Sequence, residues 1–366
     1  MGIFHEMIAQ IDDTRSERNQ RHCFETLVGT SLLAALGGID SFSGMAEYTA
    51  VNLEELEPYF EFPNGPASHD TYRNLWNAID PEQFLQVFMD FTEVLAQASQ
   101  RFISLDGKTI RHSGKDKPLH IVNAWCHANQ MTLAQKKVDE KSNEITAIPY
   151  LLGILDLKGR VVLSDAMGTQ RDICEQIIEQ KCDYVMSLKG NQGTLHKDVV
   201  DFFAHEKFLE KCTESEEYDK GHGRIEHRKA YAFTGIKWLQ KEHNWPGLKS
   251  IGMVISTVEH KGKTRTERRY FIASLKEDAR TLNYAARLHW GIENQLHWRL
   301  DVVFNEDGCC IRNDNAAENV DIMRKWALNV LQAAKRKPDQ SIKSVMRGNS
   351  MSLRYLMESV NRIFHS

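Results

Sequence analysis

The sequence predicts a mixed α/β protein preceded by a helical region, and three observations lead to this prediction. In residues 1–98 the apolar side chains recur near the 3.6-residue period of a helix. From residue 99 onward, apolar runs typical of strands alternate with helical segments, as in a mixed sheet covered by helices. The chain has 366 residues, 42% of them hydrophobic and 26% charged, which is enough for two or three domains with apolar cores.

The first region is predicted to contain four short helices. The apolar pattern places helices over residues 24–36 and 43–48, then two more that begin near Ser68 or Asp70 and at Pro81. Short helices joined by tight turns suit a helix-turn-helix module that binds DNA ends, but plain helical packing explains them better. The sequence leaves both readings of this region open.

Strands and helices then follow in a defined order. The predicted strands cover residues 102–105, 120–128, 131–138, 160–163 and 183–188, and the predicted helices cover 148–155 and 171–181. A helix, an acidic stretch at 214–217 and further strands interrupt this pattern before a strand from 270 and a long helix from 278 resume it. We therefore expect a helical domain over 1–98, an α/β domain over 99–193 and 269–335, a β-rich insertion over 194–268, and a basic tail over 336–366.

Three carboxylates are the candidate catalytic and metal-binding groups. Asp106 and Asp165 each follow an apolar strand, and ligands collect at strand ends in α/β sheets. Glu293 comes from the late helix. Such oxygen ligands suit Mg²⁺ or Mn²⁺, and two ions about 3.5–4 Å apart can activate an attacking oxygen and stabilise the leaving one. Taken alone, Asp106 followed by Gly107 is better explained as a turn cap, so the interpretation depends on the other two carboxylates.

The late helix offers alternatives to this triad. His289, Glu293 and His297 are spaced four residues apart and share one face, so they could bind zinc, although they lack the H-E-x-x-H pattern. The other candidates for the third carboxylate are Asp301, Glu306 and Asp307. The spacing by itself does not choose among them.

Basic and amide side chains are predicted to bind a phosphodiester backbone around the carboxylates. The net charge is −4, so any basic surface has to be local. The candidate DNA contacts are Lys108, Lys189, Asn191, Gln192, His222, Arg224, Arg228, His289, His297 and Arg299. Residues 261–269 and 321–366 are also rich in Lys and Arg. A solvated face explains any single run of this kind, whereas several runs on an acidic chain favour phosphate binding.

Ordered motifs over nearly the whole chain carry a resemblance to a known family. They are S-L-D-G-K at 104–108, K-S-N-E-I-T-A-I-P at 141–149, D-A-M-G-T-Q at 165–170, L-K-G-N-Q at 188–192, H-G-R-I-E at 222–226 and H-W-G-I-E-N-Q-L-H-W at 289–298. Together they resemble the H-repeat-associated branch of bacterial DDE transposases encoded by insertion sequences. The N-terminal region, with P-A-S-H-D-T at 66–71, is similar to the helical domain that precedes the catalytic domain in that family.

The resemblance implies a fold, an activity and a set of partners. It implies an RNase H-like mixed-sheet catalytic domain in which Asp106, Asp165 and Glu293 hold two Mg²⁺ or Mn²⁺ ions. The implied reaction is cleavage at the terminal inverted repeats of an insertion sequence and strand transfer into target DNA. By analogy, we expect a homodimer on DNA. Two alternatives stay open: an RNase H-fold nuclease that joins no strands, and an inactive or domesticated DNA-binding relic.

One departure from the family concerns the neighbours of Glu293. Related branches carry a Tyr, Arg, Glu and Lys signature, and its spacing falls here on Ala286, His289 and Leu300 around the glutamate. His289 could replace the Arg as a phosphate contact, and Arg299 or Lys325 could replace the Lys.

The same sequence excludes several other classes of protein. No apolar run approaches the length of about 18 residues that a transmembrane helix needs, and the first residues lack the features of a signal peptide. Seven cysteines without a C-x-x-C pair argue against a disulfide framework and a zinc finger. We expect a cytoplasmic protein, associated with the nucleoid of a bacterium.

Overall fold

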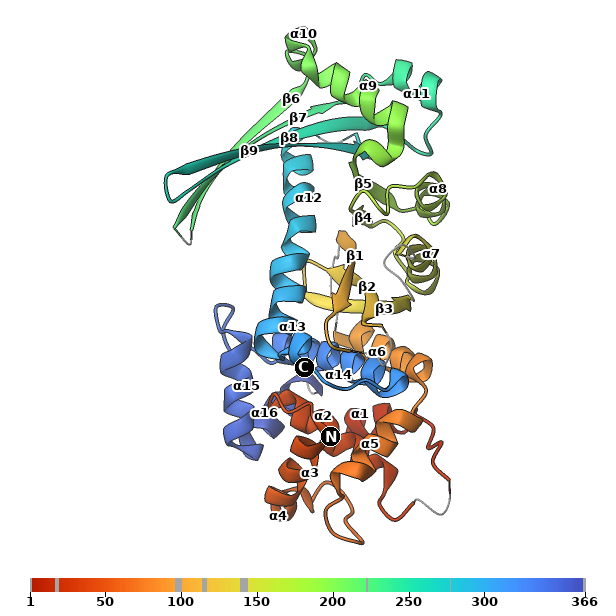
Figure 1. Ribbon diagram of the computed structural model, residues 1–366, viewed down its shortest axis with the longest axis vertical. Helices are drawn as coiled ribbons and strands as arrows, with labels where there is room; N and C mark the ends of the chain where they lie inside the picture. The colour runs from red at the N-terminus through yellow and green to blue at the C-terminus, as the bar shows by residue number, and fades with distance from the viewer. Residues whose placement is uncertain are drawn as a thin grey trace.

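The protein is elongated, with a helical layer at one end of a long sheet (Figure 1). The structure, a computed structural model, describes residues 2–16, 20–95, 101–113, 117–138, 144–221, 223–276 and 278–364. The N-terminal helices are α1 (Gly2–Ile8), α2 (Phe24–Leu36), α3 (Phe42–Val51), α4 (Leu53–Leu56), α5 (His69–Ala78) and α6 (Pro81–Leu95). They share one apolar core with α14 (Asp314–Ala333), α15 (Ile342–Met351) and α16 (Leu353–Phe364).

Helix α2 is the centre of the helical layer. Every residue from Thr26 to Leu36 is buried, as expected for a helix that is apolar all round and enclosed by others. Helix α14 packs beside it, and Asn319 on α14 donates to the backbone carbonyls of Trp76 and Ile79 at 2.9 and 3.0 Å. The first and last parts of the chain therefore build a single helical layer.

The segment that we expected to be a basic tail is folded. Residues 336–364 contain α15 and α16, and their buried side chains, among them Val345 and Leu356, belong to the same core as α2. Part of the positive charge is neutralised within the fold, because Arg336 pairs with Glu358 at 3.2 Å. Apolar residues recur at helical spacing among the many Lys and Arg residues of this segment. Each helix therefore has an apolar face that it buries.

One sheet of nine strands forms the rest of the scaffold. Its strands are β1 (Phe102–Ile110), β2 (Leu119–Cys126), β3 (Met131–Val138), β4 (Val161–Ser164), β5 (Asp183–Leu188), β6 (Thr213–Gly221), β7 (Arg224–Phe233), β8 (Ser250–His260) and β9 (Lys263–Ala273). Their order is β3-β2-β1-β4-β5-β9-β8-β7-β6. Strands β1, β4 and β5 run parallel, and the other pairs are antiparallel. The strands of the predicted insertion therefore extend the sheet, since β9 pairs with β5.

The acidic stretch at 214–217 lies within strand β6. Two residues on β7 carry the matching charges: Lys229 pairs with Glu214 at 2.8 Å, and Arg228 pairs with Glu217 at 2.9 Å. Opposite charges on facing strands stabilise a hairpin, so cross-strand pairing turns a stretch with low strand propensity into a strand. In Figure 1 the ends of β6–β9 project from the body as an arm.

Helices cover the two faces of the sheet. Helix α12 (Ala279–Ile292) lies on one face, over an apolar cluster that includes Phe102, Leu163 and Val185. The other face is covered by α7 (Glu144–Ile154), α8 (Arg171–Glu179), α9 (Gly193–Ala204) and α11 (Lys237–His243), and the short α10 (Glu206–Leu209) follows α9. Within the described ranges, no helix combines the length and apolarity needed to cross a bilayer.

Helix α7 begins earlier than the sequence pattern predicts. We placed its start near Pro149, a residue that favours the first turn, but the helix begins at Glu144 and Pro149 lies inside it. A proline there removes one backbone hydrogen bond. Burial of Ala147 and Leu151 against the sheet compensates for that loss. The earlier start carries the Glu144 carboxyl to the sheet.

Candidate active site

Asp106 and Asp165 are brought together by the parallel pairing of β1 with β4. The pairing runs up to Leu105 opposite Ser164, and each aspartate is the next residue along its own strand. Neighbouring strands lie about 4.8 Å apart, so the two backbones place the aspartates at the same level of the sheet. The sequence predicted a strand end at both positions, which is right for β4 but wrong for β1, because pairing with β2 continues the strand through Asp106 to Ile110. The register of β1 with β4 aligns the two aspartates.

Both aspartates face helix α12. Side chains alternate along a strand, so Asp106 shares a face with Phe102, and Asp165 shares a face with Leu163. Phe102 and Leu163 belong to the apolar cluster under α12. The negative charge of Asp165 acts on the pKa of Asp106 and on that of His289 of α12, which agrees with this placement.

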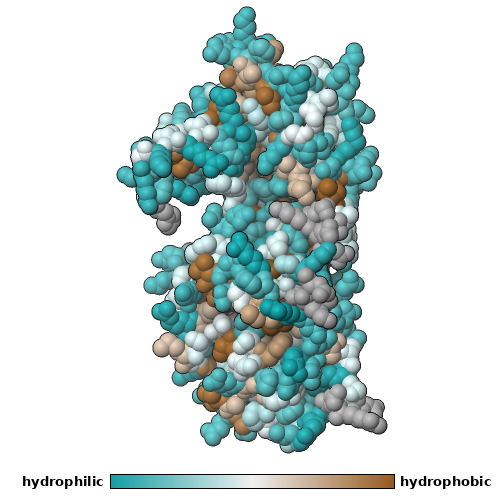
Figure 2. Space-filling model, in the orientation of Figure 1, coloured by the Kyte–Doolittle hydropathy of each residue, from teal (hydrophilic) through white to brown (hydrophobic). Residues whose placement is uncertain are grey.

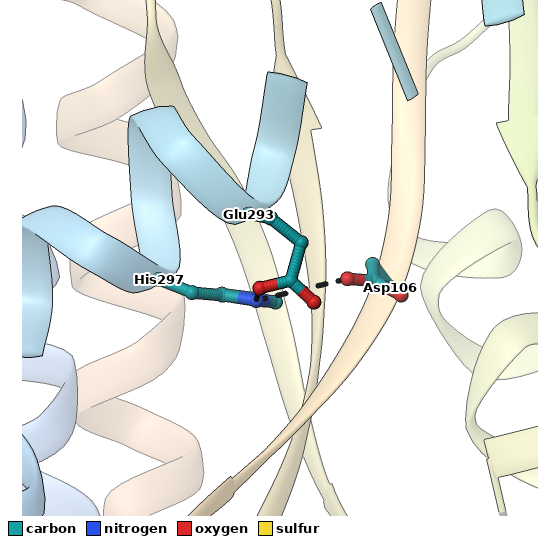
Figure 3. A group of neighbouring side chains, drawn as sticks. All are labelled: Asp106, Glu293 and His297. Atoms are coloured by element: carbon teal, nitrogen blue, oxygen red, sulfur yellow. Dashed lines mark ion pairs between the residues drawn. The ribbon is translucent and has the colours of Figure 1, made fainter. Parts of the chain in front are cut away.

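Glu293 enters the site from a π-helical turn that follows α12. This turn, η4 (Glu293–His297), separates α12 from α13 (Trp298–Val303), and single π-turns within helices frequently occur at functional sites. Leu296 and Leu300 are buried and anchor this part of the chain. Figure 3 shows the side chains of Glu293 and His297 pointing toward Asp106 on β1.

The three side chains drawn in Figure 3 form a compact donor group. His297 Nδ1 lies 3.5 Å from Glu293 Oε2 and 3.7 Å from Asp106 Oδ2. One ligand atom from each residue lies within 4.8 Å of the other two. His297 is 5% exposed, Asp106 18% and Glu293 66%, so the group is open to solvent on the glutamate side.

The electrostatics of the group favour a bound cation. Burial, together with the negative charges of Glu293, Asp165 and Glu144, raises the pKa of Asp106 to about 8. The neighbouring His297 ring lowers the pKa of Glu293. Carboxylates that converge without a Lys or Arg between them repel one another, and a divalent cation would remove that repulsion. The donor set, two carboxylates and an imidazole, therefore fits such an ion.

The loop after Asp165 holds that residue in place. Asp165 Oδ1 accepts hydrogen bonds from the backbone N–H groups of Met167 and Gly168, at 2.8 and 3.3 Å. Gly168 is required by close packing, because a β-carbon there would lie 2.1 Å from Ser164 Oγ. The D-A-M-G motif is thus a turn that the aspartate itself closes.

Asn191 and Gln192, which are exposed and half-buried, donate hydrogen bonds to the backbone of the same loop. Asn191 Nδ2 donates to the Ala166 carbonyl at 2.6 Å, and Gln192 Nε2 donates to the Thr169 carbonyl at 2.6 Å. We predicted both amides to contact DNA. In the structure, these donors are used to fix the turn that carries Asp165, so their observed contacts are structural.

Lys108 is also engaged within the protein. Its amine donates to Asp301 Oδ1 and Glu306 Oε2, both at 2.5 Å, and only 11% of its side chain is exposed. Lys108 lies on the same face of β1 as Asp106 because the two are two residues apart. The predicted contact of Lys108 with DNA would require these two ion pairs to open.

The same contacts bear on the choice of the third carboxylate. Asp301 and Glu306 are bound to Lys108, and Asp307 pairs with Arg111 at 3.5 Å and accepts from its backbone N–H at 3.1 Å. Among the four candidates, Glu293 is the one that belongs to the group around Asp106. The geometry therefore favours Glu293.

Three other cations of the sequence prediction have partners inside the protein. Arg228 is buried between Glu217 and Glu226. Arg299 donates to Gln130 Oε1 at 2.9 Å. Lys325, which we considered as a phosphate contact, is 2% exposed and donates to Gln135 and Asp321, so it cannot reach a bound polynucleotide. His222 lies outside the described residues.

Lys189, Arg224 and His289 lie where a polynucleotide could reach them. Lys189 is exposed at the end of β5, and Arg224 is exposed at the start of β7. His289 Nδ1 is buried and has no partner among the described residues. Burial lowers the pKa of His289 to about 4, so the ring is neutral at pH 7.

A polar hollow lies between the arm and helix α12. It has a volume of about 420 Å³, and its lining includes Arg224, Arg287, Asn294 and Gln295, next to Glu293. Arg269 stacks over the ring of Trp290 on α12, 4.5 Å from its centre. In Figure 2 the surface is indented beneath the arm, and the arm itself is mostly hydrophilic.

Glu144 is a site neighbour that the sequence reasoning missed. Its Oε1 lies 2.7 Å from His120 Nε2, and His120 Nδ1 lies 2.8 Å from Thr109 Oγ1. A β-carbon on Gly107 would lie 2.5 Å from Glu144 Oε1, so this pair packs directly against the backbone beside Asp106. The conspicuous motif at 141–149, which contains Glu144, was the available signal.

Comparisons with known proteins find relatives that match most of the chain. A family model described as "Transposase DDE domain" matches residues 97–330, and its associated family, "DDE_Tnp_1-associated", matches residues 5–92. The chain is 36% identical over 343 residues to "H repeat-associated putative transposase YhhI" of Escherichia coli (strain K12), covering 89% of each chain. It is equally similar, 36% over 343 residues and 89% of each chain, to "Putative protein YbfL" of the same organism.

A solved structure with a similar fold is the piggyBac transposase in a synaptic complex with hairpin DNA. The TM-score is 0.52 at 12% sequence identity, and the match covers 98% of this chain and 82% of that chain. This likeness concerns the fold alone. With the family match, it confirms the predicted RNase H-like mixed sheet with an N-terminal helical region.

Proposed function

Because the chain belongs to the DDE transposase family, we propose that it cleaves DNA at the ends of an insertion sequence and joins the freed ends to target DNA. One observation carries the proposal: the parallel register of β1 and β4 puts Asp106 and Asp165 on the sheet face that α12 covers, where η4 delivers Glu293. Asp106 lies on a central strand, Asp165 directly follows another, and Glu293 lies on a turn anchored by the buried Leu296, so each carboxylate is tied to the core of the protein.

The three carboxylates would hold Mg²⁺ or Mn²⁺. When bound, these ions supply Lewis acidity, which strengthens an attacking oxygen and offsets charge on the leaving oxygen of a phosphodiester. Asp106 and Asp165 sit on neighbouring strands and would present their oxygens from the sheet. Glu293 would present its oxygens from the solvent side, where a substrate phosphate approaches.

The surface around the site would position the DNA backbone. Lys189 and Arg224 are exposed cations, and the neutral ring of His289 on α12 would donate one hydrogen bond to a phosphate oxygen. Arg265 and Arg268 are exposed on β9 of the arm. Binding through these cations should weaken as salt rises from about 50 to 200 mM, with a slope that reports the number of phosphates they contact. Two copies would hold the two ends of one element.

The test uses the full chain with end-labelled DNA that carries the inverted repeats flanking its gene, a target plasmid, and Mg²⁺. Wild-type protein is expected to give both a cleaved end and a joined product. Asp106→Ala, Asp165→Ala and Glu293→Ala should each lower the rate by at least about a thousandfold while DNA binding is retained. Asp172→Ala, which removes an exposed carboxylate at the start of α8, is the matched control and should retain activity.

The outcomes separate the alternatives. Cleavage without a joined product would identify a nuclease of the same fold. No metal-dependent product, together with no metal binding near Asp106, would identify a DNA-binding relic. Full activity of Glu293→Ala would contradict the assignment of Glu293.

A further inference from the structure

We propose that His297 is a metal ligand, so that the ion held by Asp106 and Glu293 has one nitrogen donor and two carboxylate donors. The inference rests on the proposed function in taking Asp106 and Glu293 as metal-binding residues. It goes beyond a triad of three carboxylates, and it implies that this site binds Mn²⁺ better than Mg²⁺.

The distances are those expected for ligands of a common ion. His297 Nδ1 is almost equally far from Glu293 Oε2, at 3.5 Å, and from Asp106 Oδ2, at 3.7 Å. Both distances exceed the 2.7–3.2 Å of a good N–H···O hydrogen bond. Two atoms that each lie about 2.1 Å from one ion are roughly 3 to 4 Å apart. His297 thus lies where it would complete a binding site.

The surroundings of His297 leave Nδ1 directed at the two carboxylates. His120, by contrast, is held at both nitrogens, by Glu144 and Thr109. His297 Nε2 is buried and has no hydrogen-bond partner among the described residues, so no second bond fixes the tautomer of the ring. The backbone carbonyl of His297 lies 3.5 Å from Lys108 Nζ, a contact that ties the turn to β1.

The backbone of η4 presents Glu293 and His297 together. The π-helical turn spans these two residues, and Leu296 between them is completely buried. His289, which lies one α-helical turn before Glu293, is not part of the donor group. The zinc reading from the sequence, in which His289, Glu293 and His297 bind together, is therefore replaced by a group that includes Asp106.

The chemistry of the donors predicts the metal preference. Mg²⁺ prefers six oxygen ligands in octahedral geometry, whereas imidazole suits the transition metals. Mn²⁺ accepts carboxylates and also imidazole, and it can be observed directly by its electron spin resonance. Mn²⁺ is therefore the probe that distinguishes a nitrogen ligand from a merely neighbouring histidine.

The experiment is a Mn²⁺ titration of the full chain followed by pulsed electron spin resonance. Wild-type protein is expected to bind Mn²⁺ with a ¹⁴N coupling, and protein labelled with ¹⁵N-histidine should show the ¹⁵N coupling instead. His297→Ala should lose the coupling and bind Mn²⁺ at least about tenfold more weakly, with a smaller change for Mg²⁺. His289→Ala is the matched control and should keep the coupling.

Each outcome decides the inference. Bound Mn²⁺ without a nitrogen coupling in wild-type protein, unchanged affinity in His297→Ala, or no Mn²⁺ binding would overturn it. The labelled wild-type protein gives an answer even if His297→Ala does not fold. If the nitrogen coupling is observed but DNA is not cleaved, the proposed function is wrong and the assignment of His297 as a ligand stands. If DNA is cleaved but no coupling is observed, the ligand assignment is wrong and the proposed function stands.

Discussion

Two carboxylate clusters lie only two residues apart on strand β1, and they differ in how their charge is balanced. Asp106 meets Glu293 and Asp165 with no Lys or Arg between them, and its pKa is raised to about 8. Lys108 meets Asp301 and Glu306, and behind them lies a second buried pair. The first cluster is short of positive charge and the second is not.

The balanced cluster connects the sheet to the helical layer. Asp321 and Lys325 of α14 are buried and paired at 2.6 Å, and Gln135 of β3 is bonded to both. Buried ion pairs of this kind give little net stability, but removal of one partner is costly. The comparison teaches that unbalanced buried carboxylates indicate a site for a cation, whereas balanced ones indicate scaffold.

The largest effect is expected when a cation is removed from the balanced cluster. Lys325→Met should destabilise the protein by about 3–5 kcal/mol, because Asp321 would stay buried without its cation. Urea unfolding measures the change. Lys137→Met, which breaks the partly exposed pair with Glu318, is the matched control and should cost less than about 1 kcal/mol. Equal effects of the two substitutions would contradict the description of the cluster.

The pH dependence of the balanced cluster provides the second test. Burial and the nearby Asp321 raise the pKa of Glu306 to about 7, while Lys325 and Lys108 oppose the rise. A raised carboxyl pKa means that the folded protein resists ionisation, so stability is lost as the pH rises from about 4 toward 7.

Glu306→Gln removes this titration. The stability of wild-type protein relative to the variant should therefore fall by roughly 2–3 kcal/mol between pH 4.5 and 7.5. Urea midpoints measured across this range for both proteins provide the readout. A difference that does not change with pH would show that Glu306 ionises normally in the fold.

The third test disturbs the backbone between the two clusters. Gly107→Ala would place a β-carbon 2.5 Å from Glu144 Oε1 and 2.9 Å from His120 Nε2, both buried. We expect a loss of about 2 kcal/mol and weaker metal binding, since the strand that carries Asp106 must shift. Gly153→Ala, at a helical glycine with open space around it, is the control and should be neutral or slightly stabilising. Thermal unfolding of the two variants measures both changes in stability.

The smallest effect is expected in the unbalanced cluster and has the opposite sign. Asp106→Asn should stabilise the metal-free protein by about 1 kcal/mol at pH 8.5, because it removes one of several repelling carboxylates. Added Mg²⁺ should raise the melting temperature of wild-type protein and leave that of Asp106→Asn unchanged. If Asp106→Asn instead destabilised the protein, the negative charge of Asp106 would be compensated within the fold, as it is for Asp301 and Glu306.

Much of the architecture follows from local patterns in the sequence. The helical period of residues 24–36 predicts α2 with its bounds, and the apolar runs before Asp106 and Asp165 predict the strands that carry them. Period-two alternation then puts both aspartates on one face. These features depend on the order of neighbouring residues, so the sequence contains them.

The partners across space depend on tertiary packing. Lys108 was predicted to face DNA, yet it binds Asp301 and Glu306 nearly two hundred residues later, because β1 and the end of α13 meet only in the folded chain. The segment 336–364 is basic in sequence, but packing against α2 makes it part of the core.

The sequence by itself determined which side chains carry the chemistry, and the tertiary structure decided which of them meet. Asp106, Asp165 and Glu293 could be named from motifs because an apolar run followed by a carboxylate, and a late helix, are local features. That His297 stands beside Asp106, and that Asn191 and Gln192 bond to the turn after Asp165, depends on the register of β1 with β4 and on the seating of η4. Register and seating follow from the burial of apolar faces, a property of the whole fold that no local pattern fixes.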